Sequence, residues 1–178
     1  MIETEVKIRI QDPKAVLNRL LALGAVVARD RALEENTLYD FAAGMLKASR
    51  QALRLRRSGK RTTLTFKGSP QKSRSFKVRE EYETGVSNAG QLRRVLKALG
   101  LRPTVAYRKH RTLLRKGHLL ICLDETPVGA FLELEGKRHE ITRFARSMGY
   151  TRADFIQADY VTLIAQAGGI KGTTVREE

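Results

Sequence analysis

The sequence has few residues that could cross-link the chain, span a membrane or stack on bases. Its 178 residues include one cysteine, no tryptophan and 6% aromatic residues. The single cysteine, Cys122, excludes an intrachain disulfide and favours a reducing compartment, so we expect a cytoplasmic protein. No apolar run approaches the ~18 residues of a membrane span, and the first residues lack the pattern of a signal peptide. We therefore expect no membrane association.

Acidic residues are scarce relative to basic ones. Lys and Arg total 34 against 19 Asp and Glu, which gives a formal net charge of +15. Such an excess implies an anionic partner, which could be nucleic acid, polyphosphate or a phosphorylated metabolite. The basic stretches lack the interleaved aromatic residues on which single-stranded nucleic acid stacks. The sequence therefore argues against nucleic acid as the partner.

Alternation of apolar and polar residues predicts a series of β-strands. The segments with this period are 2–10, 36–40, 52–58, 62–68, 76–84, 104–114, 118–125 and 130–136. Capping residues, terminal glycines and apolar stripes predict helices at 13–24, 89–100, 141–149 and 153–167. Because short hairpins join several strands, we expect an antiparallel sheet and an α+β fold. One domain should cover residues 1–168, followed by a flexible tail at 169–178.

Several predicted strands carry two charges of the same sign on one face. The pairs are Glu3 and Glu5, Arg54 and Arg56, Lys109 and Arg111, and Glu133 and Glu135. These faces could be the wet outside of an open sheet, but a solvated face more often mixes signs across neighbouring strands. The alternative is a closed antiparallel β-barrel of about eight strands, flanked by helices, whose lumen holds a small ligand. In such a barrel the acidic pairs would converge on Mg²⁺ or Mn²⁺, and the basic pairs on phosphate oxygens.

The motifs resemble those of the CYTH domain family, whose members are also called triphosphate tunnel metalloenzymes. "ETEVK" at residue 3 matches the Glu-x-Glu-x-Lys signature of that family. Further matching pieces follow in family order, from residue 1 to about 165: "YD" at 39, "ALRLR" at 52, "LTFKG" at 64, "REEYE" at 79, Lys109-x-Arg111, Asp124 and "GAFLELEG" at 129. The resemblance implies a closed β-tunnel, flanked by helices, that binds a triphosphate inside.

The resemblance also implies roles for individual residues. Four carboxylates would hold a first metal ion, Mg²⁺ or Mn²⁺: Glu3, Glu5, Glu133 and Glu135. A second metal ion would be held by Asp124, Glu133 and one of Glu81 and Glu83, whose division of roles stays open. The phosphate chain would be held by Lys7, Arg54, Arg56, Lys67, Lys109 and Arg111, with Arg79 facing the same way. Among these cations, the predicted catalytic residues are Lys7, Arg56, Lys67 and Arg111.

Three activities are compatible with this pattern. The first is metal-dependent hydrolysis of inorganic triphosphate or of a small organic triphosphate. The second is adenylyl cyclisation, in which ATP gives cyclic AMP and pyrophosphate. The third is non-catalytic binding of polyphosphate or nucleic acid. The sequence shows no set of polar and aromatic residues for adenine, which favours hydrolysis, and the carboxylates argue against a pure anion binder. A homodimer is compatible with the sequence.

Overall fold

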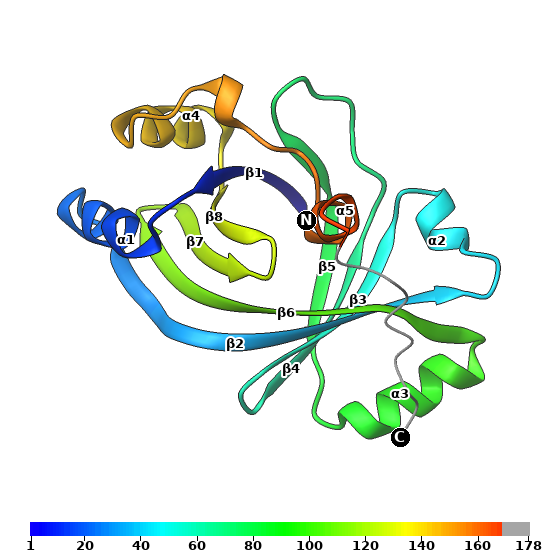
Figure 1. The fold of residues 1–178 in the computed structure, drawn as a ribbon. Coiled ribbons are helices and arrows are strands. Elements are labelled where there is room, and N and C mark those ends of the chain that lie inside the picture. Colours follow the sequence, from blue (N-terminus) through cyan, green and yellow to red (C-terminus); the bar gives the residue numbers. More distant parts are fainter. Residues whose placement is uncertain (169–178) are drawn as a thin grey trace.

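The computed structural model describes residues 1–168, and eight strands in this part of the chain form a closed antiparallel barrel (Figure 1). The strands are β1 (Ile2–Ile10), β2 (Val26–Phe41), β3 (Ala52–Ser58), β4 (Arg61–Lys67), β5 (Lys77–Gly85), β6 (Leu101–Lys116), β7 (Leu119–Thr126) and β8 (Gly129–Glu135). Around the barrel their order is β1-β5-β4-β3-β2-β6-β7-β8. The predicted α+β class and the closed barrel of about eight strands are confirmed.

The first strand closes the barrel, because β1 pairs with β5 on one side and with β8 on the other. This register sets Glu5 opposite Lys77 on β5 and opposite Glu135 on β8. Lys7 lies opposite Glu133 in the same way. The charged faces of the three strands therefore meet inside the barrel.

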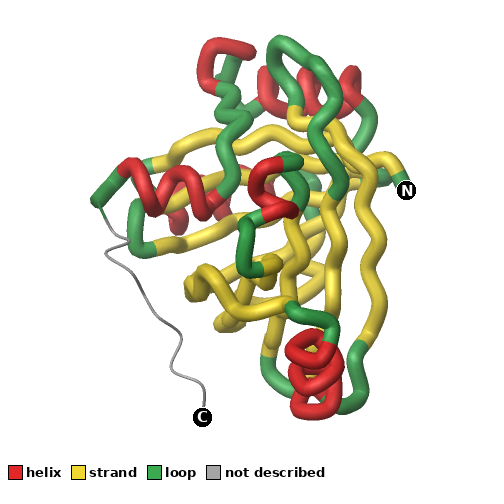
Figure 2. Tube along the Cα trace, turned by 90° about the vertical axis from the view of Figure 1, so that its right-hand side faces the viewer, coloured by secondary structure: helices red, strands yellow, loops and turns green. Residues whose placement is uncertain are grey.

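Most helices lie outside the barrel, as Figures 1 and 2 show, and the last one packs Tyr160 and Ile164 against Phe131 of β8. The helices are α1 (Pro13–Ala22), α2 (Met45–Ala48), α3 (Ala89–Ala98), α4 (Arg138–Ser147) and α5 (Tyr160–Gln166), with a short 3-10 helix, η1 (Arg152–Asp154), before α5. The predicted caps form: the Asp12 side chain accepts hydrogen bonds from the backbone of Lys14 and Ala15, and Asn88 accepts one from Gln91.

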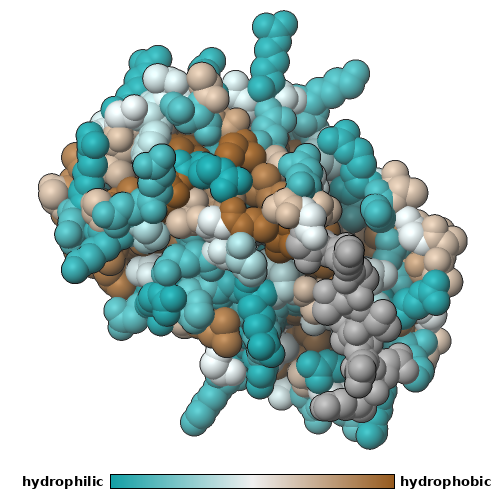
Figure 3. All heavy atoms as spheres, viewed as in Figure 1, coloured by the Kyte–Doolittle hydropathy of each residue, from teal (hydrophilic) through white to brown (hydrophobic). Residues whose placement is uncertain are grey.

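The apolar core lies between the barrel and these helices. Outward side chains of β1, β7 and β8, including Ile8, Ile121 and Leu132, pack against Leu20 of α1 and Ile141 of α4. A second, smaller cluster packs Leu96 of α3 against strands β2, β3 and β6. The face seen in Figure 3 carries mainly hydrophilic side chains with apolar ones between them. The barrel thus turns its apolar side outward to the helices and its charged side inward.

Two predicted elements begin more than four residues away from where the structure places their first residue. Strand β2 begins at Val26 rather than at residue 36, because β-bulges in its pairing with β6 break the period of two. The last helix begins at Tyr160 rather than at residue 153. Asp159 caps it, and the 3-10 helix η1 precedes it. The predicted flexible tail, 169–178, lies outside the described residues. Within residues 1–168, no helix has both the length and the apolar character needed to cross a membrane.

Adjacent residues of α1 test the location of the core. Leu20 is fully buried against the barrel, whereas Leu21 is 44% exposed. We expect Leu20→Ala to lower the free energy of unfolding by about 2–5 kcal/mol, because it leaves a cavity. Leu21→Ala should cost less than about 1 kcal/mol. Urea denaturation of both variants measures the difference, and equal losses would contradict this placement of α1.

Candidate active site inside the barrel

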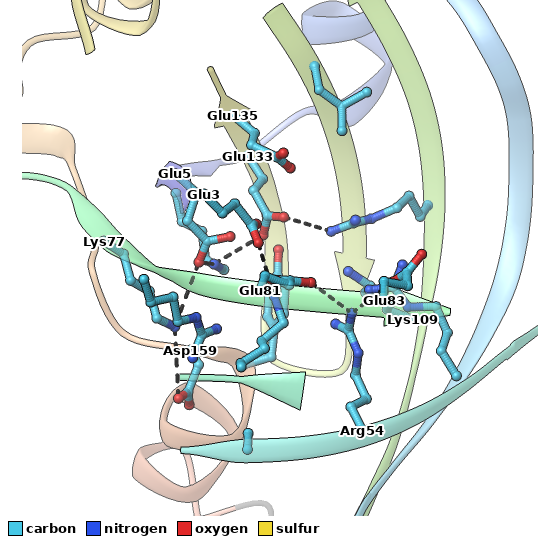
Figure 4. Close-up of a pocket in the computed structure, with 18 of the residues that line it drawn as sticks. Glu3, Glu5, Arg54, Lys77, Glu81, Glu83, Lys109, Glu133, Glu135 and Asp159 are labelled. Atoms are coloured by element: carbon cyan, nitrogen blue, oxygen red, sulfur yellow. Dashed lines mark hydrogen bonds and ion pairs between the residues drawn. The ribbon is translucent and has the colours of Figure 1, made fainter. Parts of the chain in front are cut away.

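Charged side chains from all eight strands line or adjoin one cavity of about 520 Å³ inside the barrel (Figure 4). The cations are Lys7, Arg54, Arg56, Lys67, Lys77, Arg79, Lys109 and Arg111, with Arg29, Arg61 and Arg115 also on the lining. The acids are Glu3, Glu5, Glu34, Glu81, Glu83, Asp124, Glu133, Glu135 and Asp159. All site residues predicted from the sequence are therefore brought together.

Asp124 is the most completely bonded carboxylate of the interior. It is fully buried and accepts two hydrogen bonds from Arg111 at 2.6 Å, one from Lys109 at 2.8 Å and one from the Tyr160 hydroxyl at 2.6 Å. Burial alone would raise its pKa, but Arg111 and Lys109 outweigh burial and hold the pKa below its ordinary value. Asp124 therefore stays ionised and fixes two of the predicted phosphate-binding cations in place.

A second paired group lies where β1 meets β8. The Lys7 ammonium lies 3.0 Å from carboxylate oxygens of both Glu5 and Glu133, and Arg111 lies 3.0 Å from the other oxygen of Glu133. Burial would raise the pKa of Glu133, but Lys7 and Arg111 hold it well below its ordinary value. Burial would likewise raise the pKa of Glu5, yet Lys7 lowers it to about 2. Both carboxylates are thus ionised and compensated.

Glu3 and Glu135, in contrast, have too little positive charge near them. Burial, followed by repulsion from Glu3 and Glu133, raises the pKa of Glu135 to about 7. Burial also raises the pKa of Glu3, and Lys67 does not offset it. A hard divalent cation among these carboxylates and Glu5 would remove the repulsion, so the donor set fits Mg²⁺ or Mn²⁺. The described residues hold no group of three such side chains already gathered as metal ligands.

The opposite imbalance is found on the wall formed by β3, β4 and β5, where cations have too little negative charge. Burial and the neighbouring Arg54 lower the pKa of Lys67 to about 7. Burial lowers the pKa of Lys77 to about 8, since Glu5, 3.6 Å away, compensates it only in part. The Lys77 ammonium and the Arg54 Nε make no hydrogen bond to any described residue. Arg79 is buried beside them. This wall is suited to receive an anion.

The remaining predicted residues lie near the mouths of the cavity. Glu81 pairs with Lys67 and lies 3.8 Å from Arg54. The Glu83 side chain is 46% exposed and accepts a hydrogen bond from Thr65 at 2.8 Å. Arg56 donates to the Asn36 side chain at 3.3 Å. Of the two, Glu81 lies deeper in the cavity than Glu83.

Four residues of the interior were not predicted from the sequence. Lys77 shares the face of Arg79 on β5, so the alternation alone could have identified it. Glu34 and Asn36 lie on β2, whose irregular pairing hides the alternation. Tyr160 of α5 reaches Asp124, and its ring lies 5.0 Å from the Lys7 ammonium and 4.7 Å from that of Lys109. No local sequence signal marks that contact.

Comparison with known proteins assigns the chain to a family. The sequence model of the CYTH domain matches residues 1–152. The chain belongs to the CYTH domain family. A stretch of 136 residues is 29% identical to a Methanocaldococcus jannaschii protein named "Putative adenylate cyclase", and covers 76% of this chain and 77% of that protein. Tyr160 lies beyond the matched residues, so part of this CYTH protein's interior comes from outside the matched region.

Solved structures show the same fold. A chain from Vibrio parahaemolyticus, described as a "putative adenylate cyclase", has a TM-score of 0.83 at 20% identity and covers 93% of this chain and 98% of its own. A Hippeastrum chain has a TM-score of 0.69 at 20% identity, with coverage of 94% and 97%. It is described as a "putative adenylyl cyclase" that reveals a dominant triphosphatase activity. At these identities the likeness establishes the CYTH barrel and not the substrate.

The imbalance at Glu135 predicts a pH dependence of stability in the metal-free protein. Its folded pKa of about 7 exceeds the ordinary 4.5, so the folded state binds the proton more tightly than the unfolded state. The stability from this proton is fully present below pH 4.5 and is lost as the pH rises to about 7. Glu135→Gln should remove that loss, as urea denaturation in excess chelator would measure.

Glu125→Gln is the matched control for this experiment. A hydrogen bond from Arg31 lowers the pKa of Glu125, so its contribution has the opposite sign and is lost as the pH falls below the ordinary value. If wild type and Glu135→Gln differ by a constant amount from pH 4.5 to 7, the raised pKa of Glu135 is wrong.

Proposed function

We propose that this CYTH protein hydrolyses inorganic triphosphate or a small organic triphosphate inside its barrel, with Mg²⁺ or Mn²⁺ as cofactor. The observation that carries the proposal is that two groups with unbalanced charge of opposite sign line one cavity. Carboxylates without enough positive charge lie on β1 and β8, and cations without enough negative charge lie on β3 to β5. A metal ion bound to a chain of phosphates would balance both groups at once.

The phosphate chain would bind first to the cations whose positive charge is least compensated. Arg54 and Arg79 offer guanidinium forks that match phosphate oxygens, and Lys67 and Lys77 offer point charges. Lys7, Lys109 and Arg111 would complete the enclosure from β1 and β6, and Arg56 from β3. Such fixed cations offset the charge that develops on a transferring phosphoryl group, which is the main task of a phosphoryl-transfer site.

Glu3, Glu5, Glu133 and Glu135 would hold the metal ion, which when bound polarises phosphoryl oxygens and lowers the pKa of a bound water. The second metal site predicted at Asp124, Glu133 and Glu81 or Glu83 stays a prediction. The oxygens of Asp124 already accept four hydrogen bonds, so Lys109 or Arg111 would have to turn toward the phosphate before Asp124 could bind a metal ion.

Adenylyl cyclisation is the second candidate, because the curated relative and both solved relatives carry cyclase names. In that reaction the ribose 3′-hydroxyl attacks the α-phosphorus and pyrophosphate leaves. The same cations and carboxylates would serve it. Hydrolysis is favoured because most lining residues of the cavity are charged, and its aromatic members are Tyr107 and Tyr160 alone among the described lining residues. A small-molecule partner, a cytoplasmic location and a homodimer stay predictions.

Product analysis separates the candidates. The protein is incubated with tripolyphosphate, thiamine triphosphate or ATP, each with Mg²⁺ or Mn²⁺, and the products are resolved. We expect inorganic phosphate from at least one triphosphate, and no turnover in excess chelator. Cyclic AMP and pyrophosphate from ATP would instead assign the cyclase, and absence of turnover of all three would refute both activities.

Two substitutions test the proposed metal ligands. Glu3→Gln and Glu135→Gln each remove a carboxylate that repels its neighbours, so neither should lower stability in chelator. Each should nevertheless reduce turnover at least about 10²-fold, the usual effect of losing one preorganised electrostatic group. Steady-state kinetics and urea denaturation measure the two effects. Glu125→Gln, on the outside of β7, should retain activity, and full activity of both test variants would contradict the metal site.

A further inference from the structure

Glu34 is a buried carboxylate to which the proposed mechanism gives no role. It lies in the middle of β2, its exposed fraction is 1%, and neither carboxylate oxygen makes a hydrogen bond to any described residue. A buried and unbonded carboxylate is expensive, because it loses its hydration without replacement. Its presence therefore needs an explanation other than local stability.

Four cations surround Glu34 at distances too long for hydrogen bonds. Arg29 and Arg56 lie 3.6 Å from one oxygen. Lys109 and Arg111 lie 3.7 and 3.9 Å from the other. Beyond about 3.5 Å a contact of this kind is electrostatic and has little directional bonding. Glu34 thus supplies negative charge without fixing the positions of these four cations.

Three of these cations already have acceptors that fix them. Arg111 and Lys109 bond to Asp124, and Arg56 donates to Asn36. Removing Glu34 would leave their positions defined but their charge less compensated. Burial would raise the pKa of Glu34, yet Arg111 and Arg56 hold it below its ordinary value, so the carboxylate is ionised at neutral pH.

We propose that Glu34 is a built-in counter-ion that competes with the phosphate chain for Arg56, Lys109 and Arg111. It weakens ground-state binding at these three cations and directs the chain toward the less compensated Arg54, Lys67 and Lys77. Glu34 is a positioning residue, since it acts through these cations and not on the substrate. The inference rests on the proposed triphosphate site and goes beyond it by naming the cations that bind the phosphate chain less tightly.

The neighbouring residue provides a matched control. Glu35 follows Glu34 on β2 but faces outward, where Arg57 and Arg108 pair with it. Glu34→Gln and Glu35→Gln therefore remove the same charge at adjacent positions, one inside the barrel and one outside. Glu34→Asp keeps the inner charge, and Asn36→Asp adds a second one beside Arg56.

The first measurement is steady-state kinetics with tripolyphosphate and Mn²⁺. Glu34→Gln should lower KM about tenfold, equivalent to about 1.4 kcal/mol of binding, and should not raise kcat, because the lost repulsion acts on bound substrate and transition state alike. Glu35→Gln and Glu34→Asp should keep the wild-type KM. Asn36→Asp should raise KM, which tests the inference even if Glu34→Gln does not fold. A loss of packing alone would not move KM in opposite directions for opposite charge changes.

The second measurement does not depend on catalysis. In chelator, at constant ionic strength, replacing chloride by sulfate should raise the melting temperature of Glu34→Gln more than that of Glu35→Gln. The reason is that sulfate can take the place of the removed negative charge beside the cations. If wild type turns over none of tripolyphosphate, thiamine triphosphate and ATP, the proposed function is refuted and this measurement alone decides the role of Glu34. Equal sulfate shifts, or a KM for Glu34→Gln at or above that of Glu35→Gln, overturn the inference.

Discussion

The ion pair between Arg111 and Asp124 anchors the arrangement of the whole interior. A closed barrel leaves little water to solvate charge, so ionised side chains inside it must compensate one another. Asp124 fixes Arg111 and Lys109, Arg111 reaches on to Glu133, and Glu133 with Glu5 holds Lys7. This chain of contacts links β1, β6, β7 and β8. These contacts compensate the charges in one half of the cavity and leave those in the other half only partly compensated.

The uncompensated half costs stability, and that cost is what a site prepared for ligands requires. Glu135 and Lys67 both have their pKa moved to about 7, in opposite directions, by burial and by neighbours of like charge. Perturbed groups of this kind gather at functional sites, where folding maintains an arrangement that the ligand later relieves. The barrel interior therefore gives up stability to keep charge in place before substrate arrives.

The sequence was sufficient to predict which strand faces carry the site residues, but not which acid pairs with which cation. Regular alternation identified Glu3, Glu5 and Lys7 on β1 and Glu133 and Glu135 on β8, and the structure places all five inward. The part of β2 before residue 36, which includes Glu34, was not predicted because its bulges interrupt the alternation. The contact of Tyr160 with Asp124 joins segments that no local pattern relates. Which acid compensates which cation depends on register around the closed barrel, and register is a property of the whole sheet.

The pairing of β1 with both β5 and β8 also bears on how the chain acquires its structure. Of the eight strands, β1 is made before the others and pairs with β8, which is made last, so the barrel can close only after β8 has been made. Contacts between residues so distant in sequence require a large loss of loop-closure entropy before they stabilise the fold, and this slows folding. Until closure, the charges of the lumen remain hydrated, and the ion pairs form only as water leaves. The seam between β1 and β8 is therefore expected to be the last part of the barrel to become ordered, and the charged cavity to appear with it in a single late step.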